Sequence, residues 1–208
     1  MSQPVYHYLD IGRLGRGEVV RLFLRDAGID FKDVRYAYDD TWPATSKDLM
    51  EKGISLTGKL PAIEYKGKIL SQSFHQHIPI LRFFARELGD YEGGSNYEKY
   101  VVDAVSDLYI DWRSQWVACL SGVTEEYKKK ITVDYYHLIS RYYAERGGPY
   151  LLGDKITYVD FAVYQSIDND ERIGTLPPLP ENLVKFRKIF EERPRIAEYI
   201  ASGRESQA

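Results

Sequence analysis

The sequence predicts an α/β domain followed by an all-α domain. Three observations support this fold class: a strand–helix–strand pattern over residues 5–38, a β-hairpin over residues 62–70, and purely helical periodicity after the polar, glycine-rich segment 89–95. We therefore place the α/β domain at residues 1–88 and the helical domain at residues 95–208.

The first domain begins with a strand at Val5 to Leu9, and a loop rich in glycine then leads into a helix from about Arg16 to Ala27. A second strand is expected at Phe31 to Tyr38. Strand–helix–strand units cross over with a right hand, so these two strands should be parallel. A loop with a short helix is expected over Trp42–Pro43 and Lys47–Lys52.

The hairpin is predicted by β-forming residues on both sides of Lys66-Gly67, where Gly67 can take the positive φ of a two-residue turn. Pro61 cannot donate to a strand ladder and belongs at the strand's mouth, where its peptide bond can be cis. Pro79 would cost about 3 kcal/mol in mid-helix, so we expect the next helix to start near that residue.

Ser73 can cap a helix whose first free N–H groups attract a carboxylate. The segments Gly58-Lys59-Leu60-Pro61 and Gln72-Ser73 are therefore predicted to frame one anion pocket. A strand edge and a helix cap without any ligand are the alternative.

The second domain should consist of helices only. Thr157 and Asp160 predict a helix start, because a threonine followed three residues later by an acidic side chain can satisfy the free N–H groups. Helices are expected at about residues 95–120, 124–146, 158–170, 181–191 and 194–202.

Composition excludes several classes of protein. The 208 residues are 44% hydrophobic with a net charge of −3 and no dense Lys/Arg block, which argues against nucleic-acid binding, and no apolar run is long enough for a membrane span. The single cysteine, Cys119, excludes a dithiol redox pair, and no metal site is expected from the few histidines. The N-terminus lacks a signal-peptide pattern, so we expect a cytoplasmic protein.

Nearly the whole chain resembles the cytosolic glutathione transferases. The resemblance rests on Gly58–Pro61 with Gln72-Ser73, on Tyr8-Leu9…Gly15-Arg16-Gly17-Glu18, and on Val102-Asp103-Ala104 with Asp107 and Asp111. The last two patterns are similar to tyrosine-type, sigma-like members. The resemblance implies a thioredoxin-like first domain, glutathione as cofactor, and a homodimer.

Such an enzyme must stabilise a thiolate, because a free cysteine thiol with a pKa of about 8.5 is only slightly ionised at neutral pH. Between Gln3 and Asp40 the sequence has no Ser, Thr or Cys, which leaves Tyr6 and Tyr8 as hydroxyl donors. The resemblance assigns the donor role to Tyr8, with Arg16 supplying positive charge. Tyr8 and Arg16 are eight residues apart where the family pattern has six, and Tyr8 could alternatively be a structural strand tyrosine.

The resemblance also implies the residues that hold glutathione. Trp42 and Lys47 would embrace the glycyl end, with Lys52 as the alternative to Lys47. The Leu60 backbone would pair with the cysteinyl group in the turn formed with Lys59 and Pro61, and Gln72 and Ser73 would take the γ-glutamyl group. Asp111 would reach the glutathione amino group of the partner subunit.

For the second substrate the sequence suggests Leu9, Arg113 and Trp116, while Trp112 fits either the pocket or the core. The expected reaction is transfer of the glutathione thiolate to a hydrophobic electrophile. One alternative is a glutathione-dependent double-bond isomerase with a specialised substrate. A second alternative is a non-catalytic glutathione-binding or regulatory protein.

Overall fold

The structure is a computed structural model that describes residues 3–71 and 77–203. Its contacts divide the chain into two compact units: Met1–Phe83 with Arg193–Ala208, and Phe84–Glu192. None of the described helices is both long enough and apolar enough to cross a membrane.

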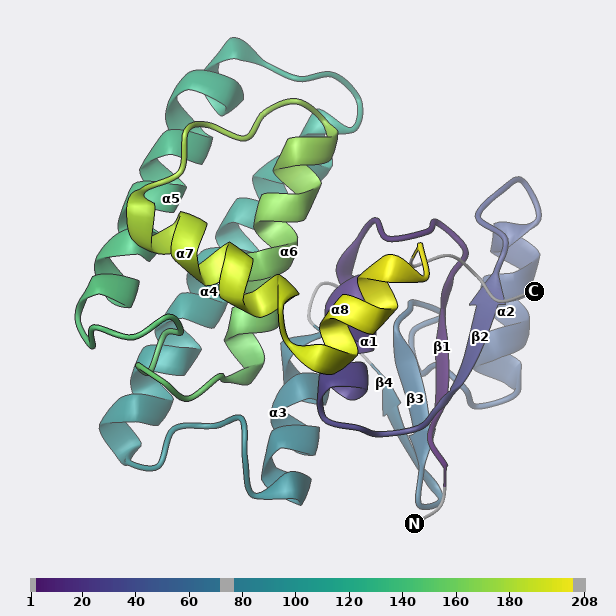
Figure 1. The fold of residues 1–208 in the computed structure, drawn as a ribbon. Coiled ribbons are helices and arrows are strands. Elements are labelled where there is room, and N and C mark those ends of the chain that lie inside the picture. Colours follow the sequence, from purple (N-terminus) through teal and green to yellow (C-terminus); the bar gives the residue numbers. More distant parts are fainter. Residues whose placement is uncertain (1–2, 72–76, 204–208) are drawn as a thin grey trace. The chain divides into compact units, whose positions relative to one another are not determined.

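The first unit is built on a four-stranded mixed sheet (Figure 1). Its strands are β1 (Val5–Leu9), β2 (Lys32–Tyr36), β3 (Ala62–Tyr65) and β4 (Lys68–Ser71), in the order β2-β1-β3-β4. β1 runs parallel to β2, and β3 runs antiparallel to β4, as the strand–helix–strand and hairpin patterns predict. β1 is also antiparallel to β3. The sheet confirms the α/β fold class of the N-terminal part. β2 is shorter than predicted.

Three helices belong wholly to this unit: α1 (Arg16–Asp26), α2 (Trp42–Glu51) and α8 (Pro194–Ala201). The apolar side chains of α1 from Val19 to Leu24 are completely buried, and α1 lies beside α8. α2 is longer than the short helix we predicted. It begins directly at Trp42, because Pro43 in the first turn lacks only an N–H that would have no helical partner there.

The hairpin turn has the predicted chemistry. Lys66 and Gly67 both have positive φ, 49° and 71°, which is the geometry of a tight two-residue turn, and the Leu60–Pro61 peptide is cis. The next helix, α3, covers Ile78–Leu88 and has Pro79 in its first turn, which confirms the predicted start near that residue. The boundary between the two units falls within α3.

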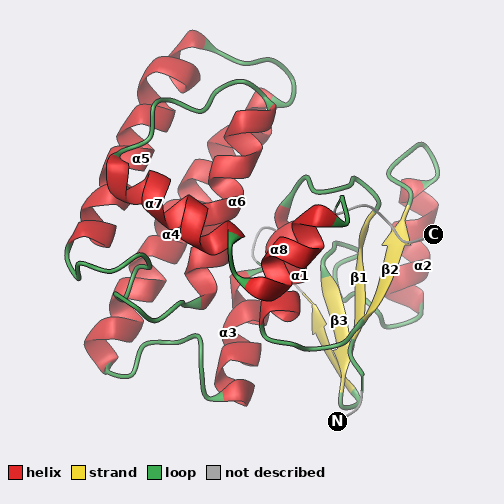
Figure 2. Ribbon diagram, in the orientation of Figure 1, coloured by secondary structure: helices red, strands yellow, loops and turns green. Residues whose placement is uncertain are grey.

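The second unit contains helices and no named strand in its described residues, which confirms the all-α class (Figure 2). They are α4 (Asn96–Cys119), a π-helical turn (Tyr127–Ile131) that continues as α5 (Thr132–Ala144), α6 (Tyr158–Arg172) and α7 (Glu181–Glu191). α6 is the core helix, because every residue from Tyr158 to Asp170 is buried.

The start of α6 follows the prediction. The backbone N–H and the hydroxyl of Thr157 both donate to Asp160 Oδ2, at 2.7 and 2.8 Å. The other oxygen, Oδ1, accepts from the Tyr143 hydroxyl at 2.6 Å and from the Leu151 N–H at 3.1 Å. This carboxylate therefore joins α6 to α5 as well as fixing the helix start.

A second buried carboxylate, Asp170, holds the far end of the same helix. Burial raises its pKa, and four hydrogen-bond donors act in the opposite direction. The donors are the side chains of Trp112 at 2.9 Å, Tyr127 at 2.8 Å, Tyr136 at 2.8 Å and Thr175 at 2.7 Å. Trp112 is therefore a core residue, which decides between the two roles that the sequence left open.

Candidate active site

Tyr8 lies at the end of β1 with its ring against the start of α1. A Cβ added to Gly17 would come within 2.1 Å of the Tyr8 ring, and one added to Gly15 within 2.6 Å of its hydroxyl oxygen. Side chains at these two positions would therefore displace the tyrosine. The loop from Asp10 to Gly15, although longer than the family pattern, still brings the backbone on both sides of Arg16 against Tyr8.

The two candidate tyrosines have different surroundings. Tyr6 is completely buried and its hydroxyl donates to the Gly17 carbonyl at 2.9 Å, and burial raises its pKa well above the ordinary value. The Tyr8 side chain is 3% exposed, yet within residues 3–71 and 77–203 its hydroxyl makes no hydrogen bond. Of the two hydroxyls, that of Tyr8 is the one left available for a ligand.

Arg21 is a residue of this region that sequence reasoning missed. Its guanidinium carbon lies 5.3 Å from the centre of the Tyr6 ring and 5.6 Å from that of Tyr8, and its Nε donates to Asp33 at 2.9 Å. The signal was present in the sequence as one arginine inside the apolar run Val19–Leu24. Arg21 fixes the position of both rings, because Asp33 holds its guanidinium in place.

α2 is tied to the loop that precedes β3. The Ser46 hydroxyl donates to the Gly58 carbonyl at 2.9 Å, and Ser55 Oγ donates to the Lys59 carbonyl at 2.7 Å. Leu60 is 8% exposed, and its backbone N–H and carbonyl take part in none of the hydrogen bonds found within the described chain. The geometry therefore leaves the Leu60 main chain available beside the cis-Pro61.

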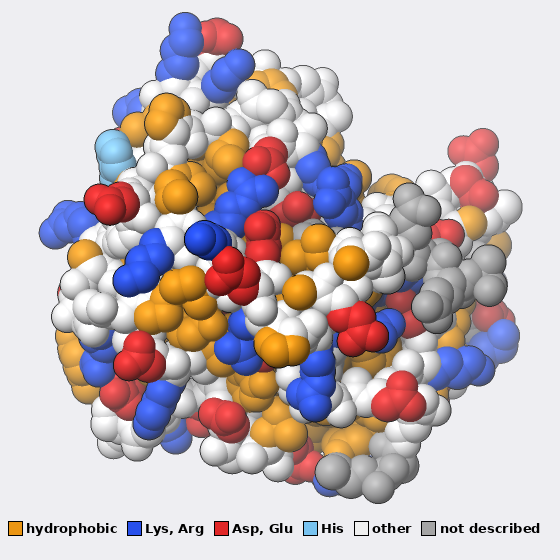
Figure 3. Space-filling model, viewed as in Figure 1, with side chains coloured by type: hydrophobic (Ala, Val, Ile, Leu, Met, Phe, Trp, Pro, Cys, Tyr) orange, Lys and Arg blue, Asp and Glu red, His pale blue; other side chains and the backbone are white. Residues whose placement is uncertain are grey.

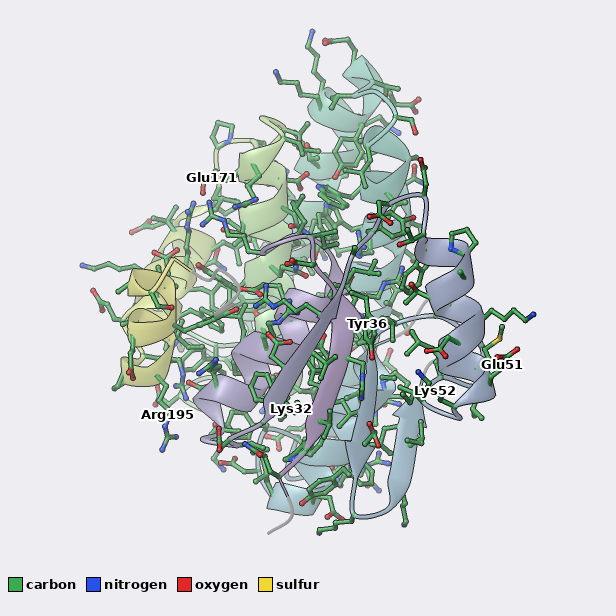
Figure 4. All side chains as sticks on the ribbon, turned by 90° about the vertical axis from the view of Figure 1, so that its right-hand side faces the viewer. Lys32, Tyr36, Glu51, Lys52, Glu171 and Arg195 are labelled. Atoms are coloured by element: carbon green, nitrogen blue, oxygen red, sulfur yellow. The ribbon has the colours of Figure 1, made fainter. Side chains whose placement is uncertain are left out.

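The residues predicted for the glycyl end all belong to α2 or its C-terminal end. Trp42 is half-buried and meets the Tyr38 ring edge-on at 5.9 Å. Lys47 and Lys52 are both exposed, and each is paired with an acid one turn earlier or later, Lys47 with Glu51 at 3.7 Å and Lys52 with Asp48 at 2.7 Å. Figure 4 labels Lys52 and Glu51 at the end of α2. These contacts do not favour one lysine over the other.

Two predicted site residues, Gln72 and Ser73, lie outside the described residues. Leu9 is half-buried as the last residue of β1 and is paired in register with Tyr36. The register of β1 with β3 ends at His7 opposite Ala62, so one residue further along Tyr8 lies opposite Pro61. The sheet therefore brings the candidate thiol-activating tyrosine next to the loop that carries Lys59 and Leu60.

The predicted residues of the second unit lie on α4. Asp111 is exposed and has no ion pair within the described chain. Arg113 and Trp116 are buried, and the guanidinium of Arg113 lies 5.0 Å from the Trp116 ring centre. Within the described residues, Arg113 Nε and Nη1 and Trp116 Nε1 are buried without a hydrogen-bond partner. Unpartnered buried polar atoms also occur elsewhere in the described chain, at Asn169 for example, so these donors by themselves do not mark a site.

Comparisons with known proteins agree on one family. Residues 110–203 match the family model described as "Glutathione S-transferase, C-terminal domain". The probable glutathione S-transferase 5 of Caenorhabditis elegans is 31% identical over 89% of this chain and 90% of its own length. Glutathione S-transferase 1 of Ascaris suum is 28% identical over 97% of both chains.

Solved structures give the same result for the whole fold. The glutathione S-transferase of Ascaris lumbricoides superposes with a TM-score of 0.77 at 28% identity, covering 96% of this chain and 97% of that one. A nematode glutathione S-transferase from C. elegans reaches a TM-score of 0.80 at 28% identity over the full length of both chains. The chain also resembles a hookworm (Necator americanus) glutathione S-transferase that is described as monomeric. The TM-score is 0.77 at 24% identity, covering 99% of this chain and 100% of that one, and at this identity the likeness shows the fold alone.

Proposed function

Because the chain belongs to the glutathione S-transferase family, we propose that it transfers the thiolate of glutathione to an electrophilic small molecule. The observation that carries the catalytic assignment is the Tyr8 hydroxyl. It makes no hydrogen bond within the described chain, while the Tyr6 hydroxyl is bound to the Gly17 carbonyl. Tyr8 is the residue that can donate to the glutathione sulfur.

The proposed chemistry needs a donor that prefers the thiolate over the thiol. A hydrogen bond to a charged acceptor is worth about 1.5 to 3 kcal/mol, and a shift of two pKa units corresponds to about 2.7 kcal/mol. One hydroxyl can therefore supply most of the free energy that a shift of two pKa units requires. The positive charge of Arg16 and the N-terminal end of α1, against which the Tyr8 ring lies, would add to it. The thiolate then attacks the electrophilic carbon of the acceptor. In a substitution the leaving group departs with its bonding pair, and in an addition the π pair moves to the other end of the conjugated system, which takes up a proton.

We propose that glutathione itself is held mainly by main-chain contacts. The Leu60 N–H and carbonyl, held by the loop between Ser55 and Pro61, suit antiparallel pairing with the cysteinyl part of the tripeptide. Residues 1–88 would form the glutathione-binding domain. Its other proposed contacts are Trp42, Lys47 or Lys52, Lys59, Gln72 and Ser73.

For the second substrate we retain Leu9, Arg113 and Trp116 as proposed contacts, the last two from α4 of the helical unit. The tyrosine-type mechanism and the likeness to sigma-like members are also part of this proposal. So is a cytoplasmic location, which fits a thiol-dependent reaction and a single cysteine.

Transfer is preferred over the two alternatives, because the curated relatives at 28 to 31% identity are named as transferases. The experiment is to incubate the protein with glutathione and a panel of unrelated electrophiles, including a conjugated carbonyl compound and a chloronitrobenzene, and to measure thiol loss and product together. We expect one glutathione consumed for each conjugate formed. A rearranged substrate with glutathione unchanged would instead establish an isomerase, and binding to a glutathione matrix without any turnover would establish a non-catalytic protein.

We further propose that the protein works as a homodimer, in which Asp111 serves the site of the partner subunit. Asp111 is exposed on α4 without an ion pair in the described chain, so its carboxylate is available to the amino group of a bound glutathione. In sedimentation at micromolar concentration we expect a species near twice 24.1 kDa. Asp111→Asn should weaken glutathione binding and leave the sedimentation unchanged, with Asp107→Asn as the matched control one turn away. A single species near 24.1 kDa in the wild type would rule out the shared site.

A further inference from the structure

A polar cleft of about 490 Å³ lies in the first unit, where the C-terminal end of α1, the start of β2 and α8 meet. Among its lining residues are Arg25, Phe31, Arg35, Arg195, Glu198 and Tyr199, and we call it the α1–α8 cleft. None of the residues proposed for glutathione lines it. Arg25 follows Arg16 by nine helical residues, so Arg25 and the start of α1 beside Tyr8 are separated by roughly 13 Å along the helix.

Figure 4 shows the same separation along β2: the labelled Arg195 of α8 lies toward the end that carries Lys32, whereas Tyr36 marks the other end of the strand. Acidic and basic side chains are interspersed over the face that carries α8 (Figure 3). The other end of the cleft approaches the candidate active site, because Arg35 is paired in register with Tyr8 and the Tyr199 hydroxyl donates to Glu18 in the first turn of α1. Arg25 and Arg195 mark the end of the cleft that lies away from Tyr8.

Arg25 is positioned in the cleft by aromatic rings rather than by an acid. Its guanidinium carbon lies 5.3 Å from the centre of the Phe31 ring and 5.1 Å from that of the Tyr199 ring. Within the described residues the Arg25 guanidinium has no ion pair and no hydrogen bond. Two ring contacts restrict the side chain while leaving its N–H donors unused, so an anion binding there would lose little further side-chain entropy.

Arg195 is positioned by the backbone at the end of α1. Its Nη1 donates to the Asp26 carbonyl at 2.9 Å, and its guanidinium covers Gly28, where an added Cβ would come within 2.8 Å of it. In the described chain this guanidinium has no carboxylate partner either. Two arginines from different elements thus line one cleft with most of their donors free.

Most acidic side chains near the cleft already accept hydrogen bonds from other side chains of the described chain. Asp33 accepts from Arg21 and from Arg35, and Asp30 accepts from the Gln3 amide at 2.8 Å. Glu198 is the exception, because it is exposed and has no ion pair within the described residues. Its charge opposes that of Arg195 in the same lining and should weaken the binding of any anion.

The geometry points to a binding site for the phosphate group of a small organic anion in the α1–α8 cleft. Arginine donors match phosphate oxygens in a bidentate manner, and two guanidinium groups from separate elements can engage different oxygens of one tetrahedral group. The cleft volume is in the range of small-molecule sites and exceeds what a bare phosphate fills, so it leaves room for the organic part.

The test is calorimetric titration of the full chain with inorganic pyrophosphate at low ionic strength. A second titration monitors the NMR signals of the arginine Nε–H groups. We expect saturable binding with one site per chain and shifts at Arg25 and Arg195. Arg25→Gln should weaken binding about tenfold, since each charge-assisted hydrogen bond is worth at least 1.5 kcal/mol. Glu198→Gln should tighten binding. Transfer activity should be unchanged in both variants.

Lys32→Gln is the matched control, because it removes one positive charge near the cleft from a residue that does not line it. Arg195→Gln repeats the test from the other arginine, with circular dichroism to check that α8 is intact. Absence of saturable binding in the wild type overturns the proposal. Equal weakening of binding by Lys32→Gln and Arg25→Gln also overturns it, because that result would show general attraction by charge. Displacement of pyrophosphate by saturating glutathione overturns it as well, because that result would place the pyrophosphate in the active site.

Discussion

Replacing Tyr8 by phenylalanine is expected to lower kcat/KM for glutathione transfer roughly 10- to 100-fold. The substitution removes a hydrogen bond to a charged sulfur, worth about 1.5 to 3 kcal/mol, and each 1.4 kcal/mol is about a tenfold change in rate. The ring keeps its place, because its close approach to Gly17 and to the Arg21 guanidinium does not involve the lost hydroxyl. Steady-state kinetics at saturating acceptor measure the effect.

Tyr6→Phe is the matched control on the same strand and the same face of the sheet. Its hydroxyl donates to the Gly17 carbonyl, so its loss should lower stability by about 1 kcal/mol while kcat/KM stays within a few-fold of the wild type. The rings of Tyr6 and Tyr8 are nearly parallel, with their centres 6.3 Å apart, so the two variants change the same pair of packed rings. An equal loss of activity in the two variants would show that the Tyr8 hydroxyl has no special role.

Asp170→Ala should be the most destabilising single substitution in the second unit, lowering the free energy of unfolding by about 3 to 5 kcal/mol. The substitution leaves the side chains of Trp112, Tyr127, Tyr136 and Thr175 without their common acceptor. Each donor would remain buried and unpaired, and each such group costs about 1 to 3 kcal/mol before the structure relaxes. Because these donors come from several elements, helix propensity at one site cannot compensate for the loss.

Urea unfolding followed by circular dichroism measures this change, with Asp107→Ala as the control. Asp107 is an exposed aspartate on α4, and its removal should change stability by no more than about 0.5 kcal/mol. A loss below about 1 kcal/mol for Asp170→Ala would contradict the role given to this carboxylate, because it is less than the cost of a single unpaired donor.

Local patterns predicted most of the fold. Three features each depend on residues a few positions apart, so the sequence alone contains the relevant chemistry. They are the turn at Lys66-Gly67, the helix start at Thr157 and the start of α3 near Pro79. The same is true of the parallel pairing of β1 with β2 and of the antiparallel pairing of β3 with β4, which follow from the order of strands and helices and from the hairpin turn. α2 was underestimated because Trp42-Pro43 was interpreted as a loop rather than as a first turn.

Interactions between distant residues could not be predicted. The sequence does not show that Trp112 and Asp170, 58 residues apart, form a hydrogen bond, or that α8 returns to place Tyr199 against Arg25. For the candidate site, the pattern of residues selected Tyr8 and Tyr6 together. The resemblance assigned the donor role to Tyr8, but the bond from Tyr6 to Gly17, which occupies the other hydroxyl, could not be predicted, because it depends on the fold of the intervening loop.

The most direct test of the central claim is the pKa of the glutathione thiol in the complex, followed by ultraviolet absorption of the thiolate. In the wild type we expect this pKa to lie about two units below the ordinary thiol value of about 8.5, and in Tyr8→Phe to return most of the way toward it. Tyr6→Phe should titrate like the wild type. The same thiol pKa in the wild type and in Tyr8→Phe would contradict the claim that the Tyr8 hydroxyl stabilises the thiolate.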